Sequence, residues 1–137
     1  MHYQFHVNVF ARPAGKVFDA FLPVSFDEAF ANLARLPRLD AEPDGFFVYA
    51  GGAGATHWCV SGQVADFGGR VHRVQLNGRC PAESLDALLG CFGWPATPLA
   101  FELIEQGAVL DETDFRAAST EASRAVPAPA PPNLPSC

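Results

Sequence analysis

The chain has little positive charge. Of its 137 residues, 9 are Lys or Arg and 15 are Asp or Glu, which gives a formal net charge of -6 at pH 7. Lys16 is its one lysine. Nucleic acids and anionic membrane surfaces attract proteins through a concentrated positive field. The charge balance therefore indicates that neither of them is the partner.

Long hydrophobic runs are also missing. No uninterrupted apolar stretch could span a bilayer, and the N-terminus lacks a basic segment followed by an apolar core. We therefore expect neither a transmembrane helix nor a signal peptide. Hydrophobic residues make up 49% of the chain and charged residues 18%, which is enough apolar material to bury a core. These features predict a folded protein of the cytoplasm.

Metal-binding patterns are missing as well. The 4 cysteines show no Cys-x-x-Cys spacing, and no His-x-x-x-His pair falls on an expected helix. His2 and His6 share a face of the first expected strand but lie about 13 Å apart at the usual rise per residue, too far to bind one ion together. We therefore expect no metal and no cofactor. We also expect free thiols, since a chain of this length can build its core without disulfides.

The glycine-rich residues 51–54 do not predict a phosphate-binding loop. Such a loop leads directly into a helix, whereas the residues from His57 onward alternate as in a strand. A flexible connection between two strands is the better interpretation.

Apolar side chains recur at every second position in several segments, as in half-buried strands. The expected strands cover residues 3–10, 46–50, 57–65, 70–77 and 99–105. One helix follows a capping box at Ser25 and Glu28, a second begins near Pro81, and a third can start at Asp111 and fray after about Ala118. Short turns between the strands require antiparallel neighbours. The sequence therefore predicts an α+β domain, with a mostly antiparallel sheet of four to five strands and two main helices packed on one face.

The last part of the chain changes in composition. Prolines at positions 127, 129, 131, 132 and 135 remove backbone donors and fix the backbone in extended conformations. We expect residues 1–118 to form a single domain and residues 119–137 to be a flexible tail, first rich in Ala and Ser and then in Pro.

One face of the expected sheet carries neutral polar side chains. If the helices cover the apolar side, the alternation places amides, imidazoles and one guanidinium on the other side. The candidate binding residues there are Gln4, His6, His57, Ser61, Gln63, Arg73 and Gln75. These groups are directional donors and acceptors suited to recognition. The alternative is the ordinary solvated face of an antiparallel sheet.

Cys80 is the strongest candidate for a reactive side chain. It precedes Pro81 at the expected start of a helix and follows Arg79. Free amides at a helix N-terminus and a neighbouring cation both favour the thiolate. The alternative is a half-buried cysteine that packs as a small hydrophobic residue.

These features favour a small acidic binding module without catalysis, which uses the polar sheet face to bind a protein partner. The negative net charge favours a basic partner, and a toxin or enzyme that this protein neutralises is one version of that function. The alternative is a thiol-dependent enzyme or redox protein in which Cys80 is the reactive thiol. The sequence leaves open whether two copies form a homodimer through their sheet edges.

Overall fold

The computed structural model describes residues 2–12 and 21–120. Their strands are β1 (His2–Ala11), β2 (Leu39–Ala41), β3 (Phe46–Gly51), β4 (Trp58–Phe67), β5 (Arg70–Pro81), β6 (Leu99–Leu103) and β7 (Val109–Leu110). Their helices are α1 (Phe26–Ala34), α2 (Ala82–Gly90) and α3 (Glu112–Ser119), with a 3-10 turn at Gly54–Thr56.

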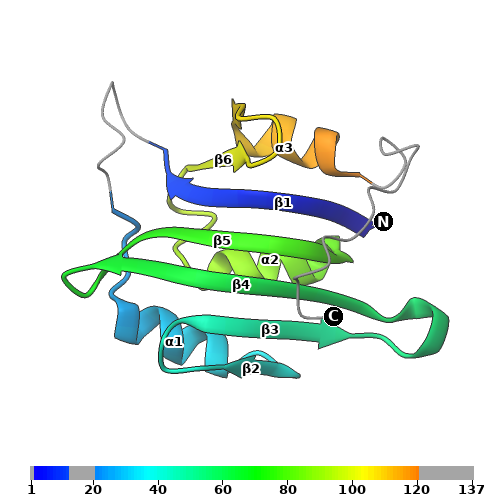
Figure 1. Cartoon of the computed structure of the whole chain (residues 1–137), viewed down its shortest axis with the longest axis horizontal. Coiled ribbons are helices and arrows are strands. Elements are labelled where there is room, and N and C mark those ends of the chain that lie inside the picture. The colour runs from blue at the N-terminus through cyan, green and yellow to red at the C-terminus, as the bar shows by residue number, and fades with distance from the viewer. Residues whose placement is uncertain (1, 13–20, 121–137) are drawn as a thin grey trace.

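The strands pair into one antiparallel sheet. Within residues 2–12 and 21–120 it has seven strands, in the order β2-β3-β4-β5-β1-β6-β7 (Figure 1). β1 lies inside the sheet, between β5 and β6. The edge strands are short, with 3 residues in β2 and 2 in β7. Short edges offer few unpaired backbone groups to the sheet of another molecule.

Side-chain caps mark the starts of two helices. At α1, the Glu28 N–H donates to Ser25 Oγ at 3.0 Å, and the Ser25 N–H donates to the Glu28 carboxylate at 3.1 Å. This pair is the capping box that the sequence predicts. At α3, the Asp114 N–H donates to the Asp111 carboxylate at 2.8 Å. Pro81 occupies the position just before α2. All three helices of the described residues therefore begin where the sequence indicates.

The side chains of the sheet separate into two layers. In β1 the odd-numbered residues from Tyr3 to Ala11 are buried, and the even-numbered residues are half-buried. The register places Val7 opposite Leu76 of β5, which is also buried. We call the buried side of the sheet the core face and the opposite side the open face.

The helices cover the core face. Leu33 of α1, Leu85 of α2 and Phe115 of α3 join the same hydrophobic core as Phe5 of β1. Phe115 stacks on Phe101 of β6 with ring centroids 4.1 Å apart, and α2 lies behind β4 and β5 in Figure 1. Because each of these helices packs into this core, the open face has no helix over it among the described residues.

The structure confirms the α+β class and the antiparallel sheet, but the number of elements differs from the prediction. The described residues contain seven strands rather than four to five, whereas α3 is the third helix that the sequence predicts from Asp111. β2 and β7 are too short, at 3 and 2 residues, for an alternating pattern to be recognised in them.

The prediction that β5 ends at Asn77 is wrong. The strand continues to Pro81, and Gly78 lies within it, opposite Phe5 of β1 and Val60 of β4. Gly78 has a φ of 145°, and a Cβ built on it would lie 2.2 Å from the carbonyl oxygen of Cys59. Glycine is therefore needed at this position because the neighbouring strands pack closely, and not because the chain turns.

The C-terminal end of the described region is helical. α3 ends at Ser119, and Thr120 forms an isolated bridge with Tyr3 of β1. The Pro-rich segment that we expect to be a flexible tail lies outside the described residues. No helix in residues 2–12 and 21–120 is long and apolar enough to cross a membrane.

Candidate functional site

The open face brings together six of the seven predicted binding residues. They lie on three neighbouring strands, as Gln4 and His6 of β1, Ser61 and Gln63 of β4, and Arg73 and Gln75 of β5. Gln75 lies opposite Gln63 on one side and Asn8 of β1 on the other. Because facing residues of paired strands point to the same side, the register gathers these side chains into one layer.

His57 is the predicted residue that does not join this layer by register. It follows the 3-10 turn Gly54–Thr56, and β4 begins one residue later, at Trp58. Its side chain is exposed. The alternation of the sequence predicts that the strand begins at His57, but His57 caps the 3-10 turn and the strand begins at Trp58.

Hydrogen bonds orient the centre of the open face. The ring Nε2 of His6 lies 3.3 Å from the amide nitrogen of Gln75. Because the amide nitrogen of Gln75 can only donate, His6 Nε2 is the acceptor of this hydrogen bond. In a neutral imidazole the proton then lies on Nδ1. That atom lies 3.9 Å from the Glu105 carboxylate. His6 is therefore held between an amide donor and a carboxylate, and its side chain is 23% exposed.

Two further contacts fix the neighbours of this pair. Asn8 donates to the Glu102 carboxylate of β6 at 2.9 Å, and Gln63 donates to the Asp44 carbonyl at 2.9 Å. Ser61 is 7% exposed, and its hydroxyl donates to the backbone carbonyl of Asn77 in β5 at 3.4 Å. Its side chain therefore lies beneath the surface of the layer. The accessible donors and acceptors are therefore mainly the longer amide and imidazole side chains.

Some polar atoms of this face have no partner within the described residues. They are Nε2 of His2 and Nδ2 of Asn77, both buried. Asn77 lies between His6 of β1 and Ser61 of β4. An unpaired buried polar atom costs free energy, and residues 2–12 and 21–120 supply no hydrogen bond that offsets this cost for the two atoms.

The site predicted from the sequence does not include the aromatic end of the open face. Phe10 continues the even-numbered series of β1, so parity alone could have placed it there. His72 packs edge-on against Phe10 and Phe21, with ring centroids 5.8 Å and 6.0 Å away. Its position depends on an irregularity in the pairing of β4 with β5, which no sequence pattern indicated.

The surroundings of Cys80 do not favour the reactive thiolate that the sequence suggests. Cys80 lies on the core face opposite Tyr3 and is 0% exposed. Burial raises its pKa from 9.0 to about 12, although the Arg116 guanidinium acts in the opposite direction. Because the thiolate is the nucleophile, Cys80 behaves as a small core residue.

The other described cysteines are also buried. Cys91 is a free thiol, and burial raises its pKa to about 11. Cys59 is disulfide-bonded, so the expectation of free thiols is wrong at this position. It lies on the open face opposite Arg79 and is 4% exposed.

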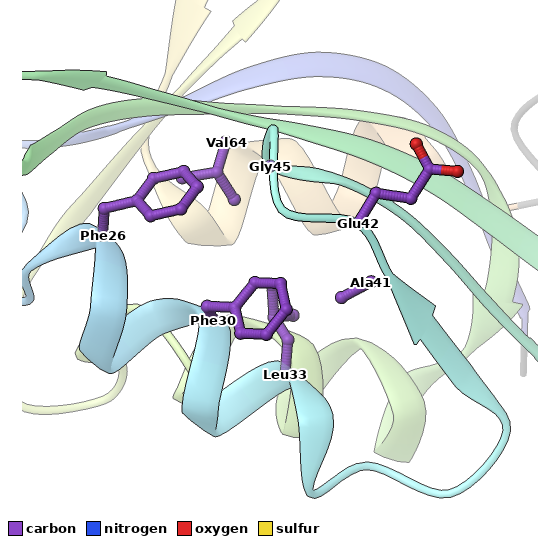
Figure 2. A pocket seen from close by; sticks show the side chains of 7 residues that line it. All are labelled: Phe26, Phe30, Leu33, Ala41, Glu42, Gly45 and Val64. Carbon is purple, nitrogen blue, oxygen red and sulfur yellow. The ribbon is translucent and has the colours of Figure 1, made fainter.

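A small pocket lies on the helix side of the sheet (Figure 2). Phe26, Phe30 and Leu33 of α1 face Val64 of β4 across it, and the Glu42 carboxylate points away from the two phenyl rings. Its lining leaves no enclosed space even for a water-sized molecule, whereas ligand sites usually enclose about 300–1,000 Å³. It offers no convergent polar groups among these lining residues, so it does not resemble a catalytic pocket.

Nothing in the described region resembles a metal centre. Within residues 2–12 and 21–120, no three His, Cys, Asp or Glu side chains lie together as a metal ion would need.

Comparison with protein-family models, with curated proteins and with solved structures finds no match to this chain.

Proposed function

We propose that this protein is a small non-catalytic binding module that binds a protein partner through the open face of its sheet. The observation that supports the proposal is the register of β4, β5 and β1. It aligns Gln63, Gln75 and Asn8 across neighbouring strands, with His6 next to them. Rigid strands hold these groups more precisely than loops would.

The chemistry of the face also favours recognition over a simple solvated surface. Amides and imidazoles each combine directional donors and acceptors, and here several are already oriented by hydrogen bonds. An oriented side chain loses less conformational entropy when it binds.

The charge of the open face bears on the kind of partner. The net charge of -6 belongs to the whole chain, whereas the open face includes Arg73 and Arg79 as well as Glu102. The whole-chain charge predicts a basic partner, but these strands carry no excess of carboxylates that would attract one. The proposal is accordingly restricted to a protein partner.

A cytoplasmic location stays a prediction. The disulfide at Cys59 is more usual in an oxidising compartment.

Alanine substitutions test the proposal. Affinity capture from the source cell supplies candidate partners, and each purified candidate is then titrated calorimetrically. We expect Gln75→Ala or His6→Ala to weaken binding by about tenfold or more, as at interface hot spots. Their melting temperatures should fall by about 4 °C at most, since a half-buried hydrogen bond contributes only about 1 kcal/mol.

Glu83→Ala is the matched control, because Glu83 is exposed on α2 in the helix layer. It should bind as the wild type does. Undiminished binding by Gln75→Ala and His6→Ala, or an equal loss in Glu83→Ala, would show that the partner does not use the open face. No observation favours the thiol-dependent enzyme as a second function, because Cys80 is inaccessible.

A further inference from the structure

An irregularity in β5 turns two consecutive side chains toward the open face. Ala65 of β4 pairs with Arg73, and Asp66 pairs with Val71, so His72 has no residue opposite it. Val71 and Val74 are both 0% exposed on the core face. The two residues between them, His72 and Arg73, therefore both lie on the open side, as expected for a β-bulge.

Aromatic rings surround this bulge. His72 packs edge-on against Phe10 of β1 and Phe21, and the guanidinium of Arg70 lies over the Phe21 ring, 4.5 Å from its centroid. A guanidinium stacked on a ring keeps the N–H donors of its edge available to a carboxylate. Phe67 faces Arg70 across the hairpin and is 77% exposed.

These residues form one patch at one end of the sheet. In Figure 1 the C-terminal end of β1 and the turn between β4 and β5 lie at the same end. We define the hairpin-end patch as Phe10, Phe21, Phe67, Arg70, His72 and Arg73.

The cations of the hairpin-end patch are available. Arg70 and Arg73 are exposed, and neither forms an ion pair with another described residue. The nearby carboxylates of Asp66 and Glu28 accept backbone N–H groups, from Gly69 and Ser25 respectively. At this end, an acidic chain thus has two exposed guanidinium groups, one of which is stacked on the Phe21 ring.

We propose that the hairpin-end patch binds an acidic segment of a protein partner. Asp or Glu carboxylates of the segment pair with Arg70 and Arg73, and an adjacent apolar side chain packs on the exposed Phe67 ring. Arg and aromatic residues are the usual anchors of protein interfaces, and Arg binds carboxylates in a bidentate manner. A nucleic acid is a poorer occupant, because the net charge of -6 repels an extended polyanion. The inference rests on the proposed function, since it names the chemistry of the partner.

A peptide titration tests it on the whole protein. The probe is a fluorescein-labelled hexapeptide, Asp-Glu-Leu-Phe-Glu-Asp, and its control replaces each acid by the corresponding amide. Binding is followed by fluorescence anisotropy and by amide chemical shifts at low ionic strength. We expect the acidic peptide to bind about tenfold more tightly than the neutral one, with shifts concentrated at residues 67–73 and at Phe10.

Matched variants complete the test. Arg70→Gln combined with Arg73→Gln should weaken the acidic peptide about tenfold, whereas Arg35→Gln, at an exposed position after α1, should not. Equal binding of the two peptides, or an equal loss in Arg35→Gln, overturns the proposal. Tighter binding of a single-stranded oligothymidine, or self-association that depends on Arg70 and Arg73, also overturns it, because the occupant is then a nucleic acid or a second copy of this chain.

The two proposals can fail separately. A purified partner that loses affinity on Gln75→Ala but not in the double arginine variant contradicts the acidic anchor and leaves the open-face function standing. A partner indifferent to Gln75→Ala and His6→Ala contradicts the proposed function, whatever the peptide does at the hairpin-end patch.

Discussion

Replacing Phe115 by alanine should strongly destabilise the protein, because this side chain docks α3 on the sheet. Phe115 is 0% exposed, stacks on Phe101 at 4.1 Å and packs at 5.9 Å against Phe5. Truncating a buried Phe costs about 3–5 kcal/mol, a figure that includes its aromatic pairs. At about 4 °C per kcal/mol for a chain of this size, the melting temperature should fall by about 12–20 °C.

Phe67→Ala is the matched control for this measurement. It removes the same side chain from a position that is 77% exposed, so the free energy of unfolding should change by less than about 0.5 kcal/mol. Both variants are measured by urea denaturation followed by circular dichroism. Equal losses, or a loss below about 1 kcal/mol in Phe115→Ala, would refute the docking of α3 on the core.

Three further outcomes follow from the same packing. At pH 8 iodoacetamide should leave Cys80 unmodified in the folded protein and alkylate it in urea. Burial raises the pKa of Cys80 from near 9.0 in the unfolded chain to about 12 in the folded protein. Because the unfolded thiol therefore ionises first, the free energy of unfolding should also fall as the pH rises above 9.0. Cys80→Ala should reduce that slope, and an unchanged slope would contradict the burial. Arg116→Gln should cost about 2–3 kcal/mol in urea denaturation, because Arg116 binds Asp86 at 2.7 Å and Glu112 at 3.0 Å while only 17% exposed. A cost near zero would mean that these ion pairs do not stabilise the fold. Gly78→Ala should lower the free energy of unfolding by more than about 1 kcal/mol. A φ of 145° is strained for a residue with a Cβ, and that Cβ would lie 2.2 Å from the carbonyl oxygen of Cys59. A thermal melt equal to that of the wild type would contradict this.

Local patterns predicted the parts of the fold that depend on local physics. The alternation in β1 and the capping box at Ser25 are both present, because side-chain periodicity and helix capping act over a few residues. The polar layer of the candidate site follows from the same alternation.

Long-range pairing explains what could not be predicted. Cys80 lies in the core because β5 continues past Gly78 along β1 and pairs Cys80 with Tyr3. The sequence suggested a turn at that point, which would have left the thiol at a helix start. His72 reaches the open face because β5 has one residue more than β4 at the bulge, and such an irregularity becomes visible only once both strands are aligned.

Site-specific photocrosslinking tests the central claim most directly. A benzophenone amino acid is placed at Gln75 on the open face or at Glu83 on the helix layer, and each protein is irradiated with the purified partner. The account predicts a covalent adduct from position 75 and none from position 83. An adduct from position 83 alone would show that the partner binds the helices and that the open face is an ordinary solvated surface.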